Sequence, residues 1–259
     1  MTVTHCQHRQ AGCGACCGIY NLDLTPNDRE ALLASRTGKF EENYRNAGRQ
    51  AHLEFRHHQE RLEEELPRHR ADIYVCPLLG YVAPGRVGCL VHPVRTGDPR
   101  SQDVSFYGSS ICQTYDCPAR EADPGLHYAD LVAELVGPAD YGRLMADYAF
   151  YRFLKAVPAF RPLVSGQAKR IRTRRVLGLL LEARLQESAS RSITSFELPE
   201  NLRDAGQLFL TLFQESLERN DHRAGRLKRL GRALALPNSY DLAHTSADAG
   251  EAPCNADSR

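Results

Sequence analysis

The feature that most constrains this chain is a group of cysteines near its start, in the stretch HCQHRQAGCGACCGIY at residues 5–20. Four thiols fall within it, and two of them, Cys16 and Cys17, are adjacent. Eight of the nine cysteines lie in the first half of the 259-residue chain. The first residues show no basic stretch followed by an apolar segment, so we expect a cytoplasmic protein in a reducing compartment. Thiols in such a compartment usually serve purposes other than disulfides.

The spacing of the cysteines indicates metal ligation. The closely spaced pairs are Cys13 with Cys16, Cys76 with Cys89, and Cys112 with Cys117. Short spacing lets one turn of backbone direct two sulfurs toward a common point, and nearby glycines tolerate the backbone angles of a tight ligand loop. The adjacent cysteines either serve two metals, or one of them ligates while the other packs or reacts. The pattern therefore predicts a loop-rich region that binds metal.

Two other uses of these thiols stay open at this point. Buried cysteines can act as small hydrophobic residues, and cysteines can form disulfides. The spacing matches neither a bacterial ferredoxin nor a zinc ribbon with two CxxC knuckles. Sulfur ligands suit zinc and iron–sulfur clusters alike. The sequence therefore predicts an iron–sulfur cluster or zinc as the cofactor, without choosing between them.

Four blocks of residues occur in order: CGACC at 13–17, CPLL at 76–79, GCLVHP at 88–93 and SICQTYDC at 110–117. Together they resemble the motifs of the YkgJ-type cysteine-cluster family of zinc- or iron-chelating proteins, over roughly residues 6–118. The chain departs from the family pattern at Gln10, where the first family cysteine would stand, and at Gln113, which replaces an arginine. The resemblance implies metal-ligand roles for Cys6, Cys13, Cys16, Cys17, Cys76, Cys89, Cys112 and Cys117.

The resemblance also implies a function. Most members of the family imply metal binding alone, so we expect a protein that holds an iron–sulfur cluster or zinc through cysteine thiolates. The flagellin lysine methylases look similar in their cysteine region and imply an iron–sulfur cluster in an enzyme. An iron–sulfur-dependent redox or protein-modifying enzyme therefore stays open, as does a regulator that responds to thiol or metal state.

The rest of the chain predicts a mainly α fold. We expect a cysteine-cluster region at 1–120 with a helical insert at 25–70, a helical region at 121–236, and a disordered tail at 237–259 that contains Cys254. Thr25 can cap the first helix of the insert, with Pro26 at its first position and Asp28 at its third. Apolar residues recur at helical spacing and predict two core stripes: Tyr141, Leu144, Met145, Tyr148, Tyr151 and Leu154, and then Leu208, Phe209, Leu212, Phe213 and Leu217.

The histidines of the insert do not predict a second metal site. His52 and His57 are five residues apart, whereas ligands on one helix face are three or four apart. We expect a solvated helix face for them and for His58 and His69. His92, beside Cys89, is a further candidate nitrogen ligand or general base. The sparse apolar residues among the charges of 51–70 suggest an arm that lies over another surface or a protein partner.

Charge and hydropathy exclude several classes of partner. The formal net charge is +1, so no overall field attracts nucleic acid. The basic runs at 169–175 and 223–232 lack interleaved aromatics, so we expect solvated helix faces and no nucleic-acid binding. The longest apolar run, VLGLLL at 176–181, is far shorter than the roughly 20 residues of a membrane span. The sequence therefore predicts a soluble protein whose main partner is a metal ion or cluster.

Overall fold

A computed structural model describes residues 6–8, 11–121, 125–161, 171–187, 205–219, 221–234 and 236. The chain is mainly helical, as predicted. It packs as two units, Met1–Asn201 and Leu202–Arg259. The division near residue 120 that the cysteine distribution suggests falls inside the first unit. The tail predicted at 237–259, with Cys254, lies outside the described residues.

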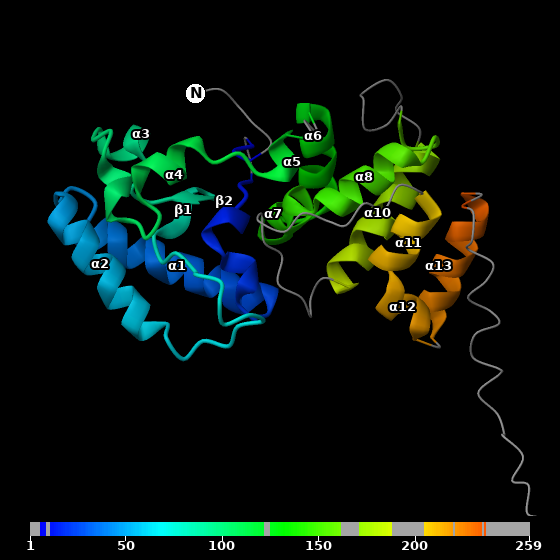
Figure 1. Cartoon of the computed structure of the whole chain (residues 1–259), viewed down its shortest axis with the longest axis horizontal. Helices are drawn as coiled ribbons and strands as arrows, with labels where there is room; N and C mark the ends of the chain where they lie inside the picture. Colours follow the sequence, from blue (N-terminus) through cyan, green and yellow to red (C-terminus); the bar gives the residue numbers. More distant parts are fainter. Residues whose placement is uncertain are drawn as a thin grey trace, which may run out of the picture. The chain divides into compact units, whose positions relative to one another are not determined.

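The cysteine-bearing part of the first unit combines short 3-10 helices, two longer helices and one hairpin (Figure 1). Its elements are η1 (Ala15–Cys17), η2 (Ile19–Asn21), α1 (Pro26–Asn43), α2 (Arg49–Leu62), β1 (Leu79–Ala83), β2 (Arg86–Cys89), α3 (Pro93–Thr96), η3 (Ser101–Val104), α4 (Gly108–Thr114) and α5 (Pro118–Glu121). The same unit continues with α6 (Gly125–Leu135), α7 (Pro138–Ala146), α8 (Tyr148–Ala156) and α10 (Ile171–Glu187).

The helical insert begins where the sequence predicts. Thr25 caps α1, because its hydroxyl oxygen accepts the Asp28 amide at 3.2 Å, and Pro26 is the first helical residue. The Thr25 hydroxyl in turn donates to the Asp28 carboxylate at 2.6 Å. The insert is two helices with a break before Gly48, and α2 ends at Leu62. The prediction of helix is therefore right for most of 25–70, although its final residues are irregular.

The β1–β2 hairpin carries Cys89 and follows Cys76 in the chain. β1 and β2 pair antiparallel, with Leu79 opposite Cys89, and Gly85 turns the chain with a positive φ of 68°. α1 packs against β1 (Figure 1), and α2 packs against η3. Aromatic and aliphatic side chains fill the space between these elements, among them the fully buried Phe40, Phe55, Leu78 and Leu90.

The first predicted core stripe is largely buried but spans two helices. Tyr141, Leu144 and Leu154 are at most 1% exposed. Asp147 separates α7 from α8, since its side chain accepts the Phe150 amide at 3.0 Å and so begins a new helix. α7 packs against η1 and α1, which links the helical part of this unit to its first cysteines.

The second unit contains α11 (Ala205–Leu212), α12 (Gln214–Glu218) and α13 (His222–Ala233). The second predicted stripe is confirmed as core, because all five of its side chains are buried. Asp221 caps α13 by accepting the amides of Arg223 and Ala224 at 2.8 and 3.0 Å. Among the helices described in both units, none combines the length and the apolar character that a bilayer span requires.

Candidate metal centre

All eight cysteines of the predicted ligand set lie on short elements or at their ends. Cys16 and Cys17 belong to η1, Cys89 ends β2, and Cys112 lies in α4. The others stand just outside an element: Cys6 in a turn, Cys13 before η1, Cys76 before β1 and Cys117 before α5. Each cysteine therefore lies in or near a short element or a turn.

Backbone hydrogen bonds bring sequence-distant cysteines together. The Cys13 amide donates to the Cys6 carbonyl at 2.9 Å, and the Cys76 amide donates to the Cys17 carbonyl at 2.8 Å. The hairpin then places Cys89 opposite Leu79, whose own amide donates to the Cys76 carbonyl at 3.4 Å. The main-chain hydrogen bond between Cys76 and Cys17 thus connects η1 to the segment that leads into the hairpin.

The thiols interact in two neighbouring sets. The first thiol group consists of Cys6, Cys13, Cys16 and Cys117, and every pair within it interacts electrostatically or by a hydrogen bond. The second thiol group consists of Cys17, Cys76, Cys89 and Cys112. In it, Cys76 and Cys89 interact with each other and with both remaining members. The thiols of Cys16 and Cys17 hydrogen-bond across the two groups, and Cys16 also interacts with Cys89 and Cys112.

This crowding opposes ionisation of most of the thiols. Burial and then the neighbouring Cys89 raise the pKa of Cys76 to about 12, and burial raises the pKa of Cys89 to about 12. The pKa of Cys6 is raised further, first by its hydrogen bond with Cys117 and then by burial. Cys16 is the exception, because the hydrogen bond from Cys17 lowers its pKa. A cluster of this kind cannot become fully thiolate unless a cation offsets the charge.

Backbone amides favour the ionised form at four of the sulfurs. The amides of Ala15, Leu78 and Val91 hydrogen-bond the sulfurs of Cys13, Cys76 and Cys89, in that order, and offset part of the rise in their pKa values. In each of these three cases the donor stands two residues after the cysteine, and at Cys16 the donors are the amides of Cys16 and Cys17. Hydrogen bonds to ligand sulfurs orient the ligands and stabilise the thiolate in metal sites.

Side chains add two further hydrogen bonds to the second thiol group. The Gln102 side chain hydrogen-bonds the Cys89 sulfur and offsets part of the rise in its pKa that burial causes. The Ser105 hydroxyl and the Cys112 thiol lie 3.2 Å apart. No pattern in the sequence indicates either partner. The rings of Phe106 and Tyr107 pack on Tyr74, with Phe106 stacked at 4.5 Å.

The first thiol group also contacts α7. The Cys13 thiol donates to the Gly142 carbonyl at 3.5 Å. A Cβ added at Gly142 would lie 2.2 Å from the Tyr20 hydroxyl and 2.9 Å from the Cys13 Cα, so glycine is needed for this close approach. No local pattern in the sequence could have identified the contact, because 129 residues separate its two ends.

The cysteines differ in their exposure to solvent. Cys76 is buried, whereas Cys16 and Cys112 are exposed. Within the described residues, no cysteine forms a disulfide. In that same part of the chain, no three or more His, Cys, Asp or Glu side chains are arranged to hold a metal ion. The thiols are therefore neighbours that form no disulfide within the described residues, but their side-chain positions are not those of a formed ligand set.

His92 and His52 have local structural partners. His92 caps α3 by accepting the Val94 amide at Nδ1, 3.2 Å away. His52 was expected on a solvated face, but it is 4% exposed, with Nε2 2.9 Å from the Tyr44 carbonyl. That expectation is wrong for His52 because the loop before α2 folds back over this side of the helix.

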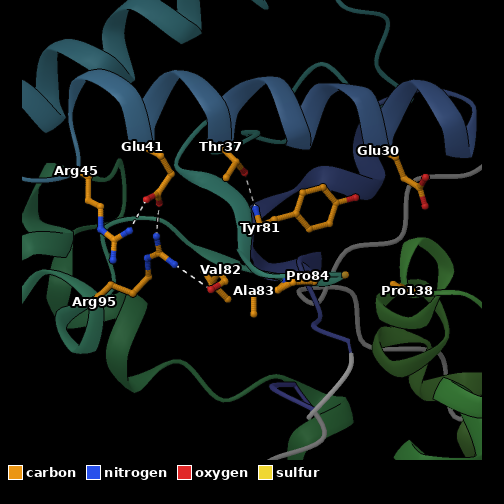
Figure 2. A pocket seen from close by; sticks show the side chains of 11 residues that line it. Glu30, Thr37, Glu41, Arg45, Tyr81, Val82, Ala83, Pro84, Arg95 and Pro138 are labelled. Atoms are coloured by element: carbon orange, nitrogen blue, oxygen red, sulfur yellow. Dashed lines mark hydrogen bonds and ion pairs between the residues drawn. The ribbon is translucent and has the colours of Figure 1, made fainter.

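A hollow of about 570 Å³ lies between α1 and the β1–β2 turn (Figure 2). On its wall, Glu41 pairs with Arg45 at 2.7 Å and with Arg95. Arg95 also donates to the Val82 carbonyl at 3.0 Å. These charged groups pair with one another, and no cysteine lines the hollow. The chemistry of the thiols is therefore separate from it.

Comparison with known proteins yields no relative: no protein-family model, no curated protein and no solved structure matches the chain.

Proposed function

We propose that this protein binds metal, holding an iron–sulfur cluster or zinc through the thiolates of its first unit. The observation that carries the proposal is the gathering of eight cysteines from separate segments into two interacting groups. The resemblance of the four cysteine blocks to the YkgJ-type family supports the same function. Thiolate sulfur is a preferred ligand of both zinc and iron–sulfur clusters.

The chemistry of the donor set fits such a group. Clustered thiols repel one another once ionised, and a bound cation removes that cost because a coordinating thiol is deprotonated outright. The amides of Ala15, Leu78 and Val91 would hydrogen-bond the ligand sulfurs and orient them. The ligands would be the members of the two thiol groups, which have to turn toward a shared point by side-chain rotation.

The bound metal would stabilise the fold as well as define the activity. Structural zinc contributes on the order of 10–16 kcal/mol in zinc-finger peptides, which is comparable with the whole stability of a domain. η1 and the elements at 86–117 are short, so few residues of regular structure hold them in place. We therefore expect chelation to unfold much of the cysteine-bearing part of the first unit.

The test is metal analysis of the full chain purified without oxygen. Iron, acid-labile sulfide and zinc are measured per chain, and the circular dichroism is recorded before and after chelation. Bound iron with sulfide, or bound zinc, supports the proposal, and loss of signal on chelation supports the structural role. Protein that folds fully with no metal, and that takes up none on reconstitution, would contradict it.

A further inference from the structure

We propose that the exposed side of α13 binds the phosphate backbone of double-stranded DNA. This helix of 12 residues contains four arginines and one lysine, and it contains no acidic residue. Arg226, Arg229 and Arg232, here called the arginine face, are all exposed. The inference goes beyond the proposed function, and it does not depend on whether the thiols hold a metal.

The arginine face lies away from the packed side of the helix. Ala224 and Leu227 are buried, and α13 packs against α12. Residues three apart are neighbours on the surface of a helix. Each arginine of the face follows the previous one at this spacing. The three side chains therefore form a row that solvent reaches along its whole length.

The charge of this row is not balanced by the protein around it. Among the described residues, no carboxylate forms an ion pair with Arg226, Arg229 or Arg232. The Arg232 Nε donates to the Lys228 carbonyl at 3.4 Å, and the Asp221 carboxylate accepts the first amides of the helix. Like charges three or four residues apart destabilise a helix. An anionic partner would remove that repulsion.

The side chains of α13 favour phosphate groups over a membrane surface. An arginine guanidinium can donate two parallel hydrogen bonds to the oxygens of one phosphate. Helices that lie on a membrane bury large apolar side chains in it. In α13, Leu227 is buried within its own unit, and no large apolar side chain of the helix is exposed. The contact that remains is electrostatic, as it is with a phosphate backbone.

The same composition favours a duplex over a single strand. Proteins hold single strands largely by stacking their bases on aromatic side chains, and α13 contains no Phe, Tyr or Trp. The missing aromatics were the reason to expect no nucleic-acid binding, but contacts with phosphates alone do not need them. At 1.5 Å per residue, the exposed arginines from Arg223 to Arg232 span about 13.5 Å, close to the major-groove width of about 12 Å. The helix can therefore reach phosphates on both sides of that groove.

The test follows the fluorescence anisotropy of a short labelled DNA duplex as the full chain is added. Binding should weaken with salt, with a slope of log K against log salt of about −3, because each phosphate contact contributes about −0.9. Arg226→Ala and Arg229→Ala should each make this slope shallower by about 1. Combining Arg226→Glu with Arg229→Glu should abolish binding. Arg70→Ala is the matched control, since Arg70 is also an exposed arginine, and it should leave the affinity unchanged.

Two further measurements separate this inference from its alternatives. Arg229→Lys keeps the charge and should keep most of the salt slope, and a loss as large as that of Arg229→Ala would contradict a charge-based contact. A single strand of the same sequence, and vesicles of phosphatidylserine and phosphatidylcholine, should bind more weakly than the duplex. Preference for either of them, no binding of the duplex at low salt, or an equal loss in Arg70→Ala would overturn the inference. Circular dichroism of each variant verifies that its helices are retained.

Discussion

Arg36 and Glu63 form an ion pair that is buried beneath the second thiol group. The Arg36 Nε donates to Glu63 at 2.9 Å, a terminal nitrogen donates to its other carboxylate oxygen, and the remaining one reaches the carbonyls of Cys76 and Leu79 at 3.3 Å each. The two side chains are 0% and 9% exposed. One arginine of α1 therefore anchors both the end of α2 and the entry to β1.

Removing the carboxylate from this pair should destabilise the first unit. Glu63→Gln leaves the buried guanidinium without its counter-charge, and breaking a buried pair in this way costs about 3–5 kcal/mol. Urea denaturation measures the loss. Asp72→Asn is the matched control, since the Arg70–Asp72 pair is solvent-exposed and should contribute little. Equal effects of the two substitutions would show that burial of the Arg36 pair adds nothing.

Local features of the fold were predictable, whereas the long-range ones were not. Thr25 as the N-cap and Pro26 as the first helical residue predict the start of α1. The apolar residues at helical spacing up to Leu154 predict the core stripe. Arg36 lies in a helix rich in charge, and nothing in its neighbours indicates that it is buried. The sequence singled out the cysteines, but their division into two groups depends on contacts between segments far apart, such as Cys17 with Cys76.

A side chain at Gly18 should lower the stability of the protein, whereas a side chain at Gly38 should raise it. Gly18 has a φ of 76°, and a Cβ there would lie 2.2 Å from the Tyr74 carbonyl oxygen. Gly18→Ala should lower the free energy of unfolding by about 1–3 kcal/mol through strain and overpacking. Gly38 lies within α1 with nothing within 4 Å of its added Cβ. Gly38→Ala should raise stability by about 0.5–1 kcal/mol, and urea denaturation of both variants would reveal any reversal of this order.

Asp147 should stabilise the first unit through two separate interactions. Its carboxylate accepts the Phe150 amide at 3.0 Å and pairs with Arg184 Nε at 2.5 Å. Asp147→Ala removes both the cap and the counter-charge and should cost about 2–4 kcal/mol. Asp147→Asn keeps a cap acceptor and should cost less in thermal or urea denaturation. If the two variants lose the same stability, the cap makes no separate contribution.

Gly142 should affect the positions of the cysteines in the first thiol group, although its helix, α7, contains none of them. A Cβ at this position would lie 2.9 Å from the Cys13 Cα, so Gly142→Ala has to push α7 away from the loop that carries Cys13. We expect a loss of about 1–3 kcal/mol in the free energy of unfolding from overpacking. The displacement should also weaken the binding of Co²⁺ to metal-free protein, followed by the visible absorption of sulfur-bound cobalt. Gly178→Ala in α10, with nothing within 4 Å of its Cβ, is the matched control and should leave cobalt binding unchanged. Unchanged cobalt binding in Gly142→Ala would mean that the contact of α7 with the loop that carries Cys13 does not affect metal binding by the first thiol group.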